Sequence, residues 1–181
     1  STERMSEARL RANQLPKVKT RLYDLDFEIL KWYTQAVANQ TTEAQLRAMA
    51  AQNNIAGQLA LSKFYLQQGD YSQAQFSLDV VKPKLKTHVL LALIQTDIYL
   101  GQNKLDLAAK SITAMQKTMP ENRALAYKFA EVLIRQGDIA QAQRLVQRFV
   151  HKNQRDIQGW QLLQQATNLD KSSALQSVNV L

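Results

Sequence analysis

The chain has 181 residues, carries a formal net charge of +8 at pH 7 and contains no cysteine. Without cysteine, disulfide bonds and thiolate chemistry are excluded, and the absence fits both a reducing and an oxidising compartment. No apolar run approaches the ~18 residues that a membrane-spanning helix needs, so no transmembrane segment is predicted. Only 5 Gly and 3 Pro occur among abundant Ala, Leu and Gln, a composition that favours helices joined by short loops.

The N-terminal region is predicted to hold helices that differ from the rest of the chain. Residues 1–16 read as a helix ended by a proline and followed by a linker. Residues 17–54 read as a degenerate helical hairpin, whose first helix spans about 22–37 because its apolar residues recur at steps of three and four. Thr42 with Gln45 suggests a capping box at the start of the second helix.

Three later stretches share one pattern, in which a helix ends at a glycine turn and a second helix follows with an alanine on its inner face. The turn glycines are Gly69, Gly101 and Gly137, and the alanines are Ala74, Ala108 and Ala142. The glycines are 32 and 36 residues apart, a mean of 34, which is the period of the tetratricopeptide repeat. We therefore predict an all-α fold, a tetratricopeptide-type solenoid of stacked helical hairpins (an α-α superhelix).

This pattern divides the rest of the chain, residues 55–181, into repeats. The predicted repeats cover about 55–86, 87–122 and 123–156, followed by a partial repeat over 157–181. In this register the turn of the second repeat, from Gly101 to Asp106, is two residues longer than the others. The partial repeat has Trp160 and Leu163 at signature positions, but Gln176 stands where the second helix needs alanine, so its hairpin is expected to be poor.

No catalytic, cofactor-binding or metal-ligating constellation is visible, so the chain is not expected to be an enzyme by itself. His88 and His151 lie far apart in sequence, belong to no HExxH pair and have no cysteine partners, which argues against a zinc site. The glycine-rich phosphate loops GxxxxGK[ST] and GxGxxG are absent, as is the GxSxG nucleophile elbow.

A partner-binding groove is the site that the solenoid predicts, because the first helix of each hairpin lines the concave surface. The mixed, moderately basic set of residues in the inward positions suits an extended peptide, with Tyr99 and Tyr127 offering rings for stacking. The candidate partner-binding residues are Lys63, Gln67, His88, Gln95, Tyr99, Tyr127, Lys128 and Arg135.

A basic cluster provides an alternative docking patch for an acidic partner. Its members are Arg144, Arg148, Lys152 and Arg155, of which the first three are four residues apart and share one helix face. Simple solvation of that face is the competing interpretation. A nucleic-acid interface is not predicted, because the excess charge is spread along the chain and the aromatic residues sit at helix-packing spacings.

Three motifs, in this order and spacing, resemble those of the BepA-like periplasmic HExxH zinc metalloprotease/chaperones of Gram-negative bacteria. Residues 2–13, Thr-Glu-Arg-Met-Ser-Glu-Ala-Arg-Leu-Arg-Ala-Asn, resemble the end of the last protease-domain helix. Residues 100–104, Leu-Gly-Gln-Asn-Lys with their longer turn, and residues 159–163, Gly-Trp-Gln-Leu-Leu, resemble the tetratricopeptide region that follows it.

The resemblance implies a periplasmic protein-interaction domain with no activity of its own, cut from a longer enzyme. Residues 1–16 are then the end of the preceding protease-domain helix and a linker, and zinc is expected in the protease domain that this sequence lacks. The implied partners are components of the outer-membrane β-barrel assembly machinery or client barrels. An independent tetratricopeptide adaptor, for pilus or envelope assembly, remains the alternative, although an adaptor has no need of a protease's terminal helix.

Overall fold

The computed structural model describes residues 42–51, 54–85 and 87–178, with side chains described as far as Lys171. The helices expected within residues 1–16 and over 22–37 lie outside this part of the chain. The described ranges form the helices α3 (Glu43–Ala51), α4 (Ile55–Gln67), α5 (Tyr71–Val81), α6 (Val89–Gly101), α7 (Leu105–Thr118), α8 (Arg123–Gln136), α9 (Ile139–Val150) and α10 (Ile157–Val178). The predicted all-α fold is confirmed for the described residues.

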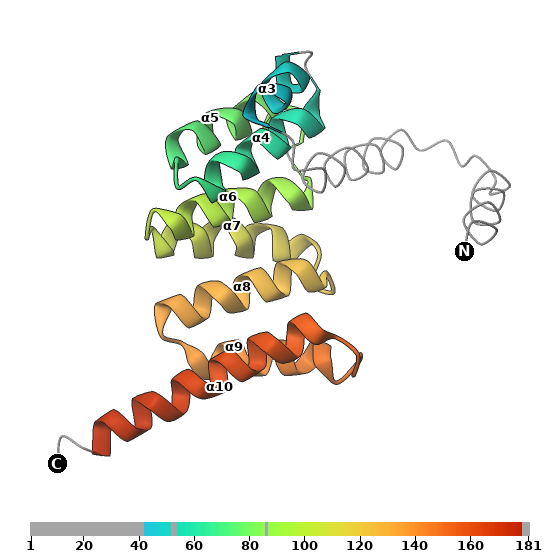
Figure 1. Ribbon diagram of the computed structural model, residues 1–181. Coiled ribbons are helices and arrows are strands. Elements are labelled where there is room, and N and C mark those ends of the chain that lie inside the picture. Colours follow the sequence, from blue (N-terminus) through green and yellow to red (C-terminus); the bar gives the residue numbers. More distant parts are fainter. Residues whose placement is uncertain (1–41, 52–53, 86, 179–181) are drawn as a thin grey trace, which may run out of the picture.

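The helices form a stack of hairpins (Figure 1). Helices α4 and α5, α6 and α7, and α8 and α9 pair with one another, and each pair packs against the next. Helices α4, α6, α8 and α10 form one layer of the stack and α5, α7 and α9 form the other. Helix α3 covers α4 at one end, and α10 closes the other end against α9 and α8. This is the helical-hairpin solenoid that the sequence predicts.

Each hairpin is held together where its two helices cross at an alanine. Ala74, Ala108 and Ala142 are completely buried, at 0% exposure, in the three clusters that make up the core. A small side chain lets the paired helices approach closely, and larger side chains such as Leu78, Ile112 and Val146 fill the space on either side.

Helix α3 begins with the capping box that the sequence predicts. The backbone N–H of Thr42 donates to Gln45 Oε1 at 2.9 Å, and the N–H of Gln45 donates to Thr42 Oγ1 at 3.4 Å. The two residues thus satisfy each other's backbone donors at the start of the helix, and this prediction is confirmed.

The first helix of each repeat begins at a capping residue, and these caps recur at a constant interval along the chain. Asn54, Asn122 and Asp156 accept a hydrogen bond from the backbone N–H three residues later, at 3.1–3.2 Å. His88 caps its helix through Nδ1, which accepts from the N–H of Leu90 at 3.1 Å. Capping satisfies backbone donors that the helix itself leaves unpaired.

The turns inside the hairpins keep the same interval as the caps. The backbone is left-handed at Gly69 (φ 75°), Asn103 (φ 57°) and Gly137 (φ 86°). In each turn the next N–H donates to the carbonyl four residues before the left-handed position, at 2.8–2.9 Å, a common way to end a helix. The turn position of the second repeat is therefore Asn103, and the prediction that Gly101 occupies it is wrong.

Gly101 is instead the last residue of α6, where it meets the side chain of Tyr71. A Cβ atom at Gly101 would collide with the Tyr71 ring, so glycine is needed for close approach rather than for a turn. The second repeat consequently begins at Val89, two residues later than predicted, and its left-handed residue comes 14 residues after the helix start, as in the first and third repeats. The longer turn expected from the sequence does not exist.

The fourth unit also differs from the prediction, because α10 runs without interruption from Ile157 to Val178. Lys171 occupies the position equivalent to Gly69 and Gly137, and a lysine disfavours the left-handed backbone that a turn requires. A single long helix therefore replaces the partial hairpin, and it extends past the edge of the stack (Figure 1).

The second helix of the second repeat lacks a cap, which gives a stability prediction. Asp70 and Asp138 cap α5 and α9 by accepting from backbone N–H groups at 3.0 and 3.1 Å, whereas the equivalent Lys104 makes no side-chain cap. We expect Lys104→Asp to raise the free energy of unfolding by about 1 kcal/mol in urea titration. The control Lys110→Asp makes the same charge change at an exposed position of α7. Equal stabilities for the two variants would contradict the repeat register.

Candidate functional site

Helices α4, α6, α8 and α10 form the layer that we call the inner layer, and a cleft lies on it between α8 and α10. Its volume is about 490 Å³. Helix α6 contributes one side chain to it and the other two helices contribute the rest. The lining residues are Leu93, Ala124, Tyr127, Lys128, Glu131, Ile134, Arg135, Gln158, Gln161, Leu162 and Gln165. We call this the inner cleft.

The inner cleft is lined by half-buried apolar side chains, which we call its floor, and by polar side chains, most of which are exposed. Leu93, Ile134 and Leu162 are half-buried at the floor, and Ala124 is exposed at one end. The lining residues of α8 span eleven residue steps and those of α10 span seven, so the cleft follows the two helix axes. An elongated cleft with this lining suits a chain segment better than a compact small molecule.

A buried carboxylate holds α10 against α8 at the end of the inner cleft. Asp156 is 5% exposed, and its Oδ2 accepts hydrogen bonds from the Tyr127 hydroxyl at 2.8 Å and from Arg123 Nη1 at 3.0 Å. Its Oδ1 caps α10 by accepting from the N–H of Gly159. A Cβ atom at Gly159 would collide with the Tyr127 hydroxyl, so glycine is required for this approach.

These contacts shift the pKa values of both groups. Burial alone would raise the pKa of Asp156, but the hydrogen bonds from Tyr127 and Gly159 and the charge of Arg123 outweigh it, so the net pKa is lowered. Burial and the bond to Asp156 raise the pKa of the Tyr127 hydroxyl. Asp156 is therefore ionised and Tyr127 neutral at physiological pH, which is the state that makes all three bonds.

A row of charged side chains crosses the inner layer from α4 to α8. Asp97 lies at the centre, with its Oδ2 3.3 Å from Lys63 Nζ and its Oδ1 2.6 Å from Lys128 Nζ. Lys128 Nζ also lies 2.6 Å from Glu131 Oε2. Burial on its own would lower the pKa of Lys128, but the charges of Asp97 and Glu131 outweigh it and raise that pKa. The two lysines and two carboxylates compensate one another.

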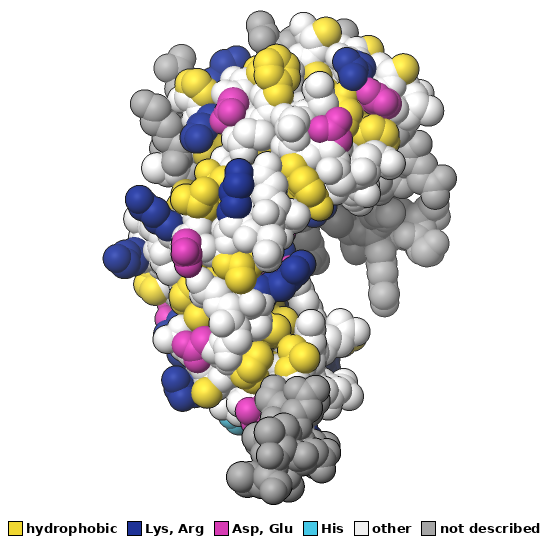
Figure 2. Space-filling model, turned by 90° about the vertical axis from the view of Figure 1, so that its left-hand side faces the viewer, with side chains coloured by type: hydrophobic (Ala, Val, Ile, Leu, Met, Phe, Trp, Pro, Cys, Tyr) yellow, Lys and Arg dark blue, Asp and Glu magenta, His cyan; other side chains and the backbone are white. Residues whose placement is uncertain are grey.

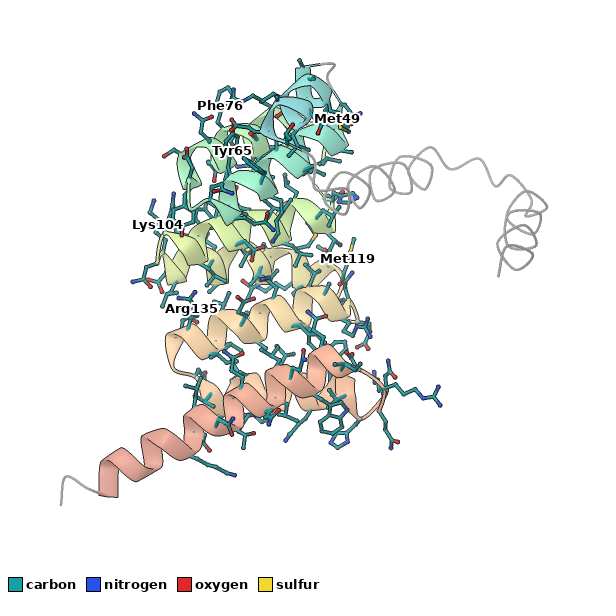
Figure 3. All side chains as sticks on the ribbon, viewed as in Figure 1. Met49, Tyr65, Phe76, Lys104, Met119 and Arg135 are labelled. Atoms are coloured by element: carbon teal, nitrogen blue, oxygen red, sulfur yellow. The ribbon has the colours of Figure 1, made fainter. Side chains whose placement is uncertain are left out.

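Four of the eight predicted groove residues face the surface of the inner layer and are at least partly exposed, namely Lys63, Gln67, Lys128 and Arg135. A fifth, Tyr127, also lines the inner cleft but is buried. Lys128 and Arg135 line the inner cleft, and Lys63 joins the charged row. Gln67 and Arg135 are exposed and occupy equivalent places near the ends of α4 and α8. Figure 3 shows Arg135 on the same edge of the stack as Lys104, where the hairpins turn. Their role in binding a partner stays a prediction.

Three predicted groove residues were assigned to the wrong face, because the second repeat was predicted to start two residues too early. They are His88, Gln95 and Tyr99. His88 caps α6, and Gln95 is 7% exposed and exchanges hydrogen bonds of 2.7 and 3.2 Å with Gln75 of α5. Tyr99 packs beside the core cluster shared by α6, α7 and α8. A shift of two residues turns a helix by about 200°, so Leu93 and Asp97 face inward instead.

The prediction for Tyr127 is corrected for a different reason, because the start of its repeat was predicted correctly. It lines the inner cleft but is only 3% exposed, and its ring packs at 5.9 Å from that of Phe149. With its hydroxyl bonded to Asp156, the side chain has little surface left to stack against a partner. Its hydroxyl and ring thus make structural contacts, and its role in binding a partner stays a prediction.

The sequence interpretation also missed the side chains that α6 and α10 contribute to the inner layer. Leu93 and Asp97 belong to α6, and Gln158, Gln161 and Gln165 belong to α10. The sequence did contain a signal for these residues. Counting on from Lys63 in steps of 34 residues, the repeat period, leads to Asp97, Glu131 and Gln165.

The alternative basic patch is exposed but partly occupied. Lys152 Nζ lies 2.9 Å from Glu121, and Arg148 donates to the carbonyl of Pro120 at 3.0 Å. Neither the Arg144 nor the Arg155 side chain has a partner among the described residues. On the face in Figure 2, Lys and Arg side chains are scattered and Asp and Glu side chains lie among them, so that face has no continuous basic surface.

No three His, Asp or Glu side chains gather among the described residues as they would to hold a metal ion. None of the helices in that part of the chain has both the length and the hydropathy needed to cross a membrane.

Comparison with known proteins identifies the repeat. Residues 99–166 match the tetratricopeptide repeat family, a segment that runs from the end of α6 into α10 and includes both long walls of the inner cleft. Comparisons with curated proteins and with solved structures found no match for the chain.

The Asp156 contacts predict a pH-dependent stability. We expect Asp156→Asn to lower the free energy of unfolding by about 1.5–3 kcal/mol at pH 7, because the charge facing Arg123 is lost and a single oxygen remains for the donors Tyr127 and Gly159. A lowered folded-state pKa contributes stability above the unfolded value of about 3.9, which is lost as pH falls through the folded pKa.

Urea titrations at pH 7 and near pH 3 measure the difference in free energy of unfolding between the wild type and Asp156→Asn. The control is Asp170→Asn, at an exposed position of α10. The difference should shrink at the lower pH. A difference of the same size at both values would show that the charge of Asp156 is not its source.

Proposed function

We propose that this domain is a protein-interaction module and that its inner cleft holds an extended segment of a partner protein. The observation that carries the proposal is the open cleft between α8 and α10, with its half-buried apolar floor and mostly exposed polar side chains. The tetratricopeptide repeat at residues 99–166 supports it, since such solenoids present an extended concave binding surface.

The geometry sets the direction of the bound segment. It lies along α8 and α10, with apolar side chains on Leu93, Ile134 and Leu162. Arg135 stands at the end of the cleft nearest the hairpin turns, exposed and with no side-chain partner among the described residues. It is available for a polar contact, whereas Lys128 is already held by Asp97 and Glu131.

We further propose that the module docks a periplasmic zinc metalloprotease/chaperone on outer-membrane β-barrel assembly components or client barrels. The resemblance of residues 2–13 and 159–163 to BepA-like proteins supports this proposal. The third motif, at residues 100–104, no longer does, because its turn has the ordinary length. An independent adaptor without a protease domain is therefore the second candidate.

The coding sequence upstream of Ser1 separates these two candidates. A signal peptide followed by HExxH and a distal zinc-ligating glutamate would support the protease context. A start codon or lipoprotein signal directly before Ser1 would support the adaptor and contradict the protease.

Filling the inner cleft should prevent docking. Ala124 and Ala140 are exposed and occupy the second position of α8 and α9, but only Ala124 lines the cleft. We expect Ala124→Trp to weaken capture of purified β-barrel assembly complex by the immobilised domain at least about tenfold, because the indole takes the space of the segment. Ala140→Trp should bind as the wild type does.

The outcomes are distinct. Equal capture by both variants would place docking outside the inner cleft. Absence of capture by the wild type would contradict the assembly machinery as the partner.

A further inference from the structure

One face of α10 consists of primary amide side chains that make no hydrogen bonds within the described part of the chain. Its members are Gln158, Gln161, Gln164, Gln165 and Asn168, which we call the amide face. All five are exposed, and none has a side-chain partner among the described residues. At 100° per residue they fall within about 120° of the helix circumference, so they share one side of α10.

The amide face belongs to the inner cleft. Gln158, Gln161 and Gln165 line the cleft itself, and Gln164 and Asn168 border an adjoining depression on α10. By contrast, the amides of Gln75 and Gln95 pair with each other across α5 and α6. The amides beside the cleft are thus left available to a ligand.

The surroundings of the amide face are electrically compensated. From Gln158 to Leu169 helix α10 carries no charged side chain. Across the cleft, Lys128 and Glu131 are paired with each other, and Asp97 is paired with both lysines of the charged row. Apart from Arg135, whose charge has no partner among the described residues, the cleft therefore offers hydrogen bonding rather than charge as its chief polar interaction.

We propose that the amide face recognises the main chain of an uncharged, extended polypeptide segment, so that binding tolerates many side-chain sequences. Each primary amide presents both donors and an acceptor, which match the N–H and C=O groups of an extended backbone. The face spans ten residue steps, about 15 Å of helix, which is the length of about five extended residues. This inference rests on the proposed function and names the class of ligand.

The probe is a fluorescein-labelled peptide of alternating leucine and serine, about eight residues long, so that it exceeds the amide face. A matched analogue has two amide bonds replaced by esters, which removes two N–H donors and leaves the side chains in place. Binding to the full chain is measured by fluorescence anisotropy. We expect the ester analogue to bind at least about tenfold more weakly.

The protein variants test the other side of the contact. Gln161→Met with Gln165→Met removes two amides at similar size and should weaken the parent peptide at least about tenfold. The control, Gln141→Met with Gln147→Met, changes exposed glutamines of α9 and should leave binding unchanged. Replacing one serine of the peptide by aspartate, or raising salt from about 50 to about 500 mM, should change affinity less than about threefold.

Including Ala124→Trp in the same titration separates the two proposals. If it weakens binding while the ester analogue and the methionine variant do not, the cleft binds peptide but main-chain recognition is wrong. If the parent peptide binds and Ala124→Trp has no effect, the cleft is not the site and the proposed function fails as well. No binding of the parent peptide, or a strong preference for the aspartate peptide that salt removes, overturns the inference.

Discussion

The close crossing of two helices at a buried alanine, repeated at a constant interval in every hairpin, is the constraint on which this structure depends. Ala74, Ala108 and Ala142 have no exposed surface, and each fixes how its hairpin closes. The helix caps and the left-handed turn residues recur at the same interval. Because helix starts, turns and crossings repeat at one interval, successive hairpins stack with equivalent residues side by side. This is why Lys63 and Asp97 can pair across neighbouring repeats.

The inner cleft lies where this regular repetition of hairpins ends. In the first three repeats, a second helix folds back on the first, but α10 continues as a single helix because Lys171 takes the place of a turn residue. Asp156 ties the start of α10 to α8 through Tyr127 and Arg123. Helices α8 and α10 are thereby held as two walls, and the charged residues Asp97 of α6 and Lys128 and Glu131 of α8 satisfy one another. What remains for a partner is an apolar floor, Arg135 and the amide face.

The helical-hairpin fold could be predicted from the sequence because the alanine and glycine pattern reports directly on helix crossing and turning. The register of the second repeat could not be obtained from glycines alone. Gly101 serves a close approach to Tyr71, while Asn103, one of the few non-glycine residue types that tolerate a left-handed backbone, forms the turn. The burial of Tyr127 was also missed, because it depends on Asp156, 29 residues away in sequence. The position of Lys128 and Arg135 at the cleft could be predicted, because it follows from the start of the third repeat alone.

Methyl NMR spectroscopy of the domain during titration with the segment that it binds would show where that segment lies. Leu93, Ile134 and Leu162 lie at the floor of the inner cleft, whereas Val80 and Leu107 are exposed on α5 and α7 in the other layer of the stack. If the segment occupies the inner cleft, the methyl signals of the three floor residues shift and those of Val80 and Leu107 stay in place. Shifts confined to Val80 and Leu107 would show that the partner binds the opposite layer and not the inner cleft.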